Sequence, residues 1–182
     1  MRSLLKFLAA FAVAFALMIF VRATGFTIYT IGGEALEPEL MSGDRVLVNR
    51  WSYGLRTGGG GSLFSYGRVC RQRVKPGDLV AFEDPRDSLS GSVLICRCKA
   101  VPGDTVVHGG HTIVVPGVDD CADADYYWMQ ALNPQTDSLD SRLLGLISEQ
   151  LIIGRVCKVV FSHPSDSSLF AGWRSERLMM PL

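Results

Sequence analysis

The sequence predicts a mainly β protein, with a coiled β-sheet or barrel body behind one N-terminal transmembrane helix. Two observations support this fold class. The segment 7–21 is an uninterrupted apolar stretch that follows Arg2 and Lys6. Beyond residue 25 the chain changes to short segments of alternating apolar and polar residues, separated by Gly and Pro turns, with little helix signal. Short strands joined by such turns are typical of sheet and barrel folds.

The apolar stretch is expected to be a membrane anchor. Together with Leu4 and Leu5 it has about the minimum length that spans a bilayer core. Positive charges ahead of it favour a cytoplasmic N-terminus and an exported body. We therefore expect a single-pass protein of the bacterial cytoplasmic (inner) membrane, with its N-terminus inside and its body on the outer or periplasmic face. The alternative is a cleaved signal peptide, for which the apolar stretch is a little long.

The sequence beyond residue 25 predicts a series of strands. Strand patterns occur at 26–31, 45–55, 77–85, 92–101 and 151–162, and a hairpin is expected around Gly109-Gly110 within 104–115. In the second of these strands, Val46 and Val48 share one face, whereas Arg45, Leu47 and Asn49 share the other.

The remaining segments are less regular. A short helix or a loop is expected within 137–150, and "TGGGGS" at 57–62 predicts a flexible tip. The acidic segment 116–136 is predicted to be a loop-rich insertion. We accordingly divide the chain into an anchor, residues 1–25, and a β domain, residues 26–182.

Composition excludes some classes of function. Eighteen basic residues balance eighteen acidic ones, and a nucleic-acid-binding protein needs a basic face. The cysteines are odd in number: Cys70, Cys96, Cys98, Cys121 and Cys157. Their only close pair, Cys96 and Cys98, lacks the CxxC spacing of most zinc sites, so buried thiols are the favoured interpretation. We expect no metal and no cofactor.

Four segments carry a family resemblance. They are "ALEPELMSGDRVLVNRWSYGLR" (35–56), "VKPGDLVAFEDP" (74–85), "CRCKAVPGD" (96–104), and "DSLDSRLLG" (137–145) with "IIGRV" (152–156). In this order, behind one N-terminal span, the chain resembles the type I signal peptidases of the S26 family. That family consists of membrane-anchored serine peptidases with a Ser/Lys dyad, so the resemblance implies a role in signal-peptide processing and protein secretion.

The departures from the family pattern fall on the catalytic positions. The resemblance places Ala35 where the family has its nucleophilic serine, and Cys96 where the family has its general-base lysine. Gly33 stands where many members have a serine that helps to bind the oxyanion. The resemblance also assigns Leu36 and Pro38 to substrate binding. Alanine has no group that can attack a carbonyl, so no catalytic residue of the dyad is intact.

A supporting block is nevertheless present. Ser138, Asp140, Ser141 and Arg142 match the residues that hold the cleft and buttress the lysine in the resembling family. A buried polar network costs little when every member is satisfied, and losing one partner is expensive. These residues therefore predict that the chain retains the fold of the resembling family, in which Asp140 and Arg142 form a stabilising pair.

Neighbouring residues offer poor substitutes for the dyad. Because side chains alternate along a strand, Lys99 is expected to point away from the face that carries Cys96. Ser42 belongs to a predicted turn, and Thr30 lies on the preceding strand. A thiol nucleophile at Cys96 would need a lowered pKa and a nearby base. His108 and His111 flank the predicted hairpin tip, and His163 lies outside the family blocks.

We therefore expect a catalytically inactive member of the signal peptidase family. Its partners would be the membrane and either exported precursor signal peptides or an active signal peptidase, since strand addition to a peptide does not need a nucleophile. One alternative is an active signal peptidase with relocated catalytic residues. A second alternative is an envelope β-domain with a structural role.

Overall fold

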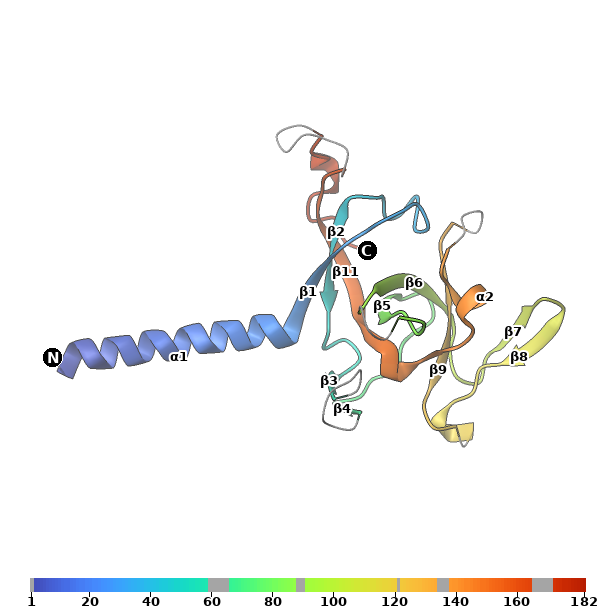
Figure 1. Ribbon diagram of the computed structural model, residues 1–182, viewed down its shortest axis with the longest axis horizontal. Helices are drawn as coiled ribbons and strands as arrows, with labels where there is room; N and C mark the ends of the chain where they lie inside the picture. The colour runs from blue at the N-terminus through green and yellow to red at the C-terminus, as the bar shows by residue number, and fades with distance from the viewer. Residues whose placement is uncertain (1, 59–65, 88–90, 121, 134–137, 165–171) are drawn as a thin grey trace.

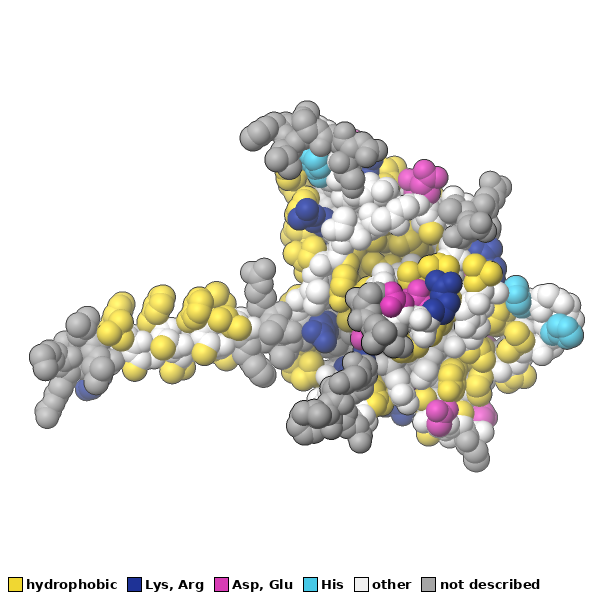
Figure 2. Space-filling view, viewed as in Figure 1, with side chains coloured by type: hydrophobic (Ala, Val, Ile, Leu, Met, Phe, Trp, Pro, Cys, Tyr) yellow, Lys and Arg dark blue, Asp and Glu magenta, His cyan; other side chains and the backbone are white. Residues whose placement is uncertain are grey.

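The N-terminal helix stands apart from a β body. The computed structural model describes residues 2–58, 66–87, 91–120, 122–133, 138–164 and 172–182, with the side chains of 2–5 and 20–24 left out. Helix α1 (Arg2–Gly25) projects away from the strands (Figure 1). Its described side chains are mostly apolar and exposed, as the yellow atoms along it show (Figure 2). Over the described residues, no helix combines the length and the apolar character that a membrane crossing requires.

The body is built on one curled antiparallel sheet, which confirms the mainly β prediction. The strand order is β1 (Phe26–Thr30), β2 (Asp44–Asn49), β11 (Ile152–Ser162), β5 (Leu79–Glu83), β6 (Val93–Ala100), β9 (Tyr126–Gln130) and β10 (Ile147–Ser148). Two further ribbons are β3 (Leu55–Thr57) with β4 (Gly67–Val69), and β7 (Thr105–His108) with β8 (His111–Val114). The strands wrap around the centre of the body (Figure 1).

The long strand β11 allows the sheet to curl. It pairs with β2 and β5, and its register shifts twice against β2 and once against β5. Such bulges bend a strand and increase its twist. Gly154 lies where β11 crosses close to β2, and a Cβ atom there would collide with the carbonyl oxygen of Asn49. A residue without a side chain is required at this crossing.

The hydrophobic residues form a core on both faces of the central strand. In β5, Leu79 and Ala81 pack into one cluster, whereas Val80 and Phe82 pack into another. The alternation predicted for β2 is confirmed, because Val46 and Val48 are fully buried. Strand β5 therefore separates two cores, and the sheet is covered on both faces there.

Short helices complete the described chain. Helix α2 (Ser141–Leu144) falls within the segment that predicted a short helix or loop. Single 3-10 turns occur at Val118–Asp120, Glu149–Leu151 and Ser175–Arg177. Arg177 in the last turn pairs with the buried Asp44 at 2.6 Å, which ties the C-terminal segment to β2.

One segment differs from its prediction, and another lies mostly outside the described residues. The segment 116–136 was expected to be rich in loops, but residues 126–130 form β9, a strand of the main sheet. Aromatic residues favour strands, and Tyr127 and Trp128 are buried in the cores. Most of the predicted flexible tip at 57–62 lies outside the described residues. The division into an anchor and a β domain stays a prediction.

Candidate peptide-binding cleft

The cleft lies between the end of β1 and an open stretch of β6. It has a volume of about 440 Å³. One wall is the segment 29–36, and the other includes residues 93–96 of β6. On one side these β6 residues pair with β5, but pairing with β9 on the other side begins only at Arg97. The second edge of residues 93–96 therefore has no strand partner among the described residues, and it faces the cleft.

Folding brings Ala35 and Cys96 to the same cavity, as the resemblance implied. Both line the cleft, together with Gly33, Leu36 and Ser138. The carbonyl of Ala35 accepts a hydrogen bond from the amide of Asn133 at 2.9 Å, which holds its segment against the loop after β9. The side chain of Ala35 presents only a methyl group to the cavity, and a methyl group cannot attack a peptide bond.

Cys96 is held as a neutral thiol. It is 2% exposed, and its Sγ donates to the carbonyl of Leu139 at 3.8 Å. Burial and, to a smaller extent, the Asp140 carboxylate raise the pKa of the Cys96 thiol, whereas the Arg142 charge lowers it, and the resulting pKa is about 12. Because the thiolate is the nucleophilic form, a thiol with this pKa is a poor nucleophile at neutral pH.

This thiol should resist alkylation. We expect iodoacetamide at pH 8 to modify the exposed Cys70 readily and to leave Cys96 unmodified in the folded protein. Below a pKa of about 12, the thiolate fraction of Cys96 rises about tenfold for each pH unit, so its labelling should increase towards alkaline pH. Peptide mapping by mass spectrometry measures both sites. Equal labelling of Cys70 and Cys96 at pH 8 would contradict a buried neutral thiol, and labelling in denaturant serves as the control.

The other polar groups of the cleft do not form a Ser/Lys dyad. Thr30 and Ser138 supply hydroxyls, and the Ser138 hydroxyl donates to the carbonyl of Asn133 at 3.4 Å. None of the described residues that line the cleft is a lysine or a histidine. Lys99 is exposed and lines a separate cavity, which confirms that it points away from Cys96. Histidine and lysine, the usual bases beside such nucleophiles, are thus absent from the described lining, in which Glu34 supplies a carboxylate.

Asp140 organises the floor beneath the cleft. Its carboxylate is fully buried and pairs with Arg142 at 2.8 Å. It also accepts the amides of Ala131 at 3.1 Å and of Arg142 at 2.9 Å, the second of which caps α2. Burial by itself would raise the pKa of Asp140, but these hydrogen bonds and the Arg142 charge outweigh it and hold the pKa below its ordinary value.

Ser141 completes this network. Its hydroxyl oxygen accepts the amide of Met129 at 2.8 Å. The side chains of Asp140 and Ser141 therefore take the place of a neighbouring strand along β9, because they satisfy amides at alternate positions. The predicted pair of Asp140 and Arg142 is formed, and its contacts are those of a structural support.

Only one of the two residues proposed to bind substrate lines the cleft. Leu36 lines the cleft and packs into a core, whereas Pro38 is exposed and is not among the described residues that line the cavity. Gly33 lines the cleft with a φ of 80°, a left-handed conformation that disfavours a side chain. Their roles stay predictions. The sequence did not single out Tyr29, Ile95 or Ala131, which also line the cleft; the alternation in 92–101 was the signal for Ile95.

Comparison with known proteins identifies the family. Residues 4–130 match the family described as "Signal peptidase, peptidase S26". Signal peptidase IB of Staphylococcus aureus strains N315 and Mu50 is 29% identical over 171 residues, which cover 85% of this chain and 88% of the relative. The family match covers most of α1, the cleft residues from β1 to β6 and the strands up to β9. This chain therefore belongs to the S26 signal peptidase family.

Proposed function

We propose that this chain is a membrane-anchored, catalytically inactive signal peptidase homologue whose cleft binds the signal peptides of exported precursors. The proposal rests on one observation: Ala35 and Cys96 line the same cavity. Serine or cysteine catalysis needs a nucleophile and a base within hydrogen-bond reach of each other. At these two positions the cleft offers a methyl group and a neutral thiol with its pKa raised to about 12.

Peptide binding does not require the lost groups. The open edge of β6 at residues 93–96 can hydrogen-bond an extended segment through its backbone. The cleft is lined mainly by apolar and small residues, among them Ile95, Leu94 and Ala131. Such a surface suits the apolar and small side chains of a signal peptide.

Membrane attachment through α1 is part of the same proposal. A helix of 24 residues is about 36 Å long. Apolar side chains such as Phe7, Val13 and Leu17 are more than half exposed, which is costly in water and favourable in lipid. With Arg2 and Lys6 at its start, the helix would place the body on the outer face of the cytoplasmic membrane.

The test separates binding from cleavage. The full-length chain in detergent is incubated with a precursor carrying a fluorescent signal peptide, and an active signal peptidase serves as the positive control. We expect no cleavage, but a rise in fluorescence anisotropy on binding. Ala35→Phe should reduce binding because it fills the cleft, whereas Thr112→Phe on the exposed β8 should not.

Each contrary outcome points to an alternative. Cleavage that is lost in Cys96→Ala or Ser138→Ala would indicate a peptidase with relocated catalytic residues and would overturn the proposal. Absence of both binding and cleavage would favour either a complex with an active signal peptidase or a structural role in the envelope. Co-purification with an active peptidase distinguishes these two roles.

A further inference from the structure

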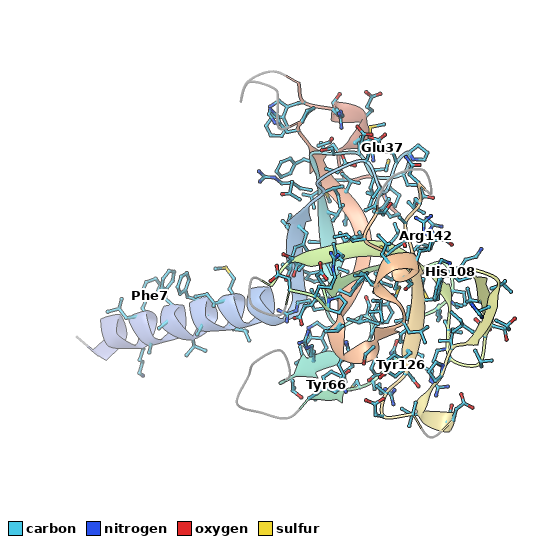
Figure 3. All side chains as sticks on the ribbon, turned by 45° about the vertical axis from the view of Figure 1, so that its right-hand side comes forward. Phe7, Glu37, Tyr66, His108, Tyr126 and Arg142 are labelled. Atoms are coloured by element: carbon cyan, nitrogen blue, oxygen red, sulfur yellow. The ribbon has the colours of Figure 1, made fainter. Side chains whose placement is uncertain are left out.

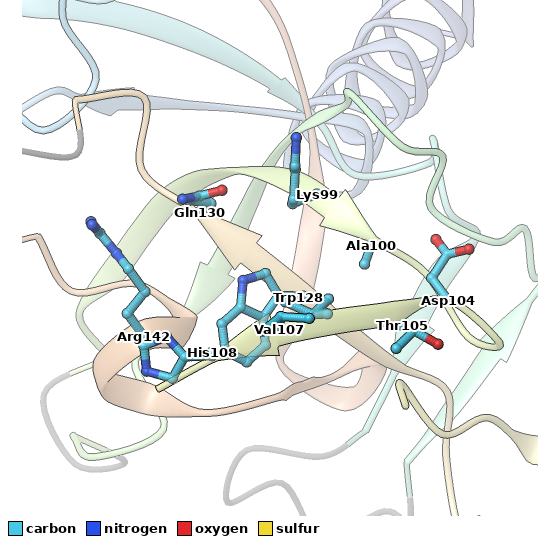
Figure 4. Close-up of a pocket in the computed structure, with 10 residues that line it drawn as sticks. Lys99, Ala100, Asp104, Thr105, Val107, His108, Trp128, Gln130 and Arg142 are labelled. Carbon is cyan, nitrogen blue, oxygen red and sulfur yellow. The ribbon is translucent and has the colours of Figure 1, made fainter. Parts of the chain in front are cut away.

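A second cavity lies beside the β7–β8 hairpin. It has a volume of about 520 Å³ and shares no described lining residue with the cleft. Its walls come from the end of β6, from β9, from α2 and from β7 (Figure 4). We call it the hairpin groove and define it by Lys99, residues 104–108, Trp128, Gln130 and Arg142.

The groove follows the outer edge of β7. Four consecutive residues of β7 line it, Thr105 to His108, and no residue of β8 does. If the groove lay on one face of the hairpin, side chains of both strands would contribute at alternate positions. The described sheets also give β7 only one partner, β8. The groove therefore runs along the strand edge that faces away from β8.

The hairpin register shows which backbone groups face the groove. The pairs 106/113 and 108/111 alternate with 105/114 and 107/112. The amide of Val115 donates to the carbonyl of Asp104, so the pair 104/115 is a hydrogen-bonded one. In an antiparallel pair every second position is hydrogen-bonded. The N–H and C=O groups of Thr105 and Val107 consequently point outward, and no hydrogen bond joins them to another described residue.

Cationic groups gather along one side of the groove. The ammonium of Lys99 forms no ion pair within the described part of the chain, and Arg142 keeps 27% of its side chain exposed while it pairs with Asp140. His108 lies beside Arg142 (Figures 3 and 4). Asp104 marks the other end of the groove, away from Arg142 (Figure 4). A ligand with one negative group is therefore favoured near Lys99 and Arg142 and disfavoured near Asp104.

A neighbouring cavity extends the cationic side. It measures about 220 Å³ and shares Lys99 and Gln130 with the hairpin groove, and Arg97, whose guanidinium pairs with Glu39, also lines it. Lys99, which forms no ion pair within the described residues, is thus the cation that both cavities share.

We propose that the hairpin groove binds an extended, acidic peptide segment of another protein. The segment adds as a third strand to β7 through the outward backbone groups of Thr105 and Val107, and a Glu or Asp side chain lies against Lys99 and Arg142. Strand addition supplies affinity through the main chain, and side-chain sites supply specificity. This binding site is separate from the cleft, and the proposal does not rest on the proposed function.

The probes are three synthetic peptides that differ at one position. They are capped peptides of sequence Val-Thr-Val-Glu-Val-Thr, with Gln or Lys in place of Glu as controls. Amide chemical shifts of the full-length, ¹⁵N-labelled chain in detergent locate the binding site and give the dissociation constant. We expect the Glu peptide to shift the amides of Thr105 and Val107 and to slow their hydrogen exchange. The Gln peptide should bind about fivefold more weakly, the effect of one exposed charge pair.

Two matched pairs of variants test the two halves of the proposal. Val107→Pro removes an outward N–H from the edge of β7, whereas Val114→Pro removes an outward N–H from the far edge of β8. The first should abolish binding and the second should leave it intact. Lys99→Gln should remove the preference for Glu over Gln, and Lys75→Gln, in an exposed turn, should keep it.

Several results would overturn the proposal. These are equal binding of the Glu, Gln and Lys peptides, equal effects of Val107→Pro and Val114→Pro, or no shift at millimolar peptide. Shifts confined to residues 29–36 and 93–96 would mean that the peptide occupies the cleft instead. Displacement of the Glu peptide by inorganic phosphate or by vesicles of anionic lipid at equal charge concentration would indicate a general anion site.

Discussion

Placing a Ser/Lys dyad at the two positions that the family resemblance assigns to it, by Ala35→Ser plus Cys96→Lys, is expected to yield signal-peptide cleavage at least about 100-fold slower than that of an active signal peptidase. A lysine acts as a base only when it is neutral, which requires surroundings that lower its pKa. Position 96 is buried, which favours neutrality. However, the Asp140 carboxylate lies close enough to raise the pKa of Cys96, and the same charge would hold a lysine in its protonated form.

Gly33, the position proposed to help bind the oxyanion, gives a second reason to expect weak cleavage. Gly33 has no hydroxyl, and loss of one oxyanion donor costs about two to three orders of magnitude in rate. Adding Gly33→Ser should not recover this factor, because φ at position 33 is 80° and a serine there is strained.

Cleavage of a labelled precursor by the full-length variant in detergent measures the rescue. Each single variant is the control, and circular dichroism verifies the fold. Turnover by the double variant within about tenfold of the active peptidase, well above the rescue that the lost donor allows, would show that the cleft kept the surroundings that the reaction needs. It would also show that Asp140 does not hold the introduced lysine protonated.

Asp140→Ala is expected to lower the free energy of unfolding by about 3 kcal/mol, within the range for breaking a buried ion pair. The carboxylate is fully buried and supports three groups at once: the guanidinium of Arg142, the amide of Arg142 and the amide of Ala131. Removing it leaves these donors without their acceptor and removes the cap of α2. Because Arg142 is partly exposed and can rehydrate, the loss should stay at the lower end of that range.

Urea unfolding at pH 7 measures this loss. Asp120→Ala, at an exposed site, should change stability by less than about 0.5 kcal/mol. The folded-state pKa of Asp140 is lowered from its ordinary value of 3.8, so its contribution is complete above that value and disappears as pH falls through the folded pKa. The gap between wild type and Asp140→Ala should therefore narrow below about pH 4. A constant gap from pH 7 to pH 3 would contradict this account.

Local patterns in the sequence were sufficient for much of the fold. The alternation of Val46 and Val48 gave the buried face of β2, and the paired glycines gave the β7–β8 turn. The aromatic residues 126–128 also carried a strand signal, but the acidic residues before them favoured a loop. Tertiary burial decides such a segment: Tyr127 and Trp128 gain enough contact in the cores to make 126–130 a strand.

The sequence likewise predicted some features of the candidate site and could not predict others. The family blocks predicted that Ala35 and Cys96 would lie together, and alternation along the strand predicted that Lys99 would point elsewhere. The open edges of β6 and β7 could not be predicted, because pairing partners decide which backbone groups remain unbonded. For β6 the deciding fact is that β9 begins to pair only at Arg97.

Strand β6 is a wall shared by the cleft and the hairpin groove. Residues 93–96 line the first cavity, and Lys99 and Ala100 line the second, with pairing to β9 between them. A peptide in the cleft would pair with β6 directly, and a peptide in the hairpin groove would contact β6 through Lys99. Each would restrain this one strand, and a restrained strand costs less to order for a second ligand. Thermodynamic linkage then requires reciprocity. If a peptide in the groove changes the affinity of the cleft for its ligand by some factor, a ligand in the cleft changes the affinity of the groove for its peptide by the same factor. Binding of two polypeptides at separate places on the body would in this way be coupled through one strand.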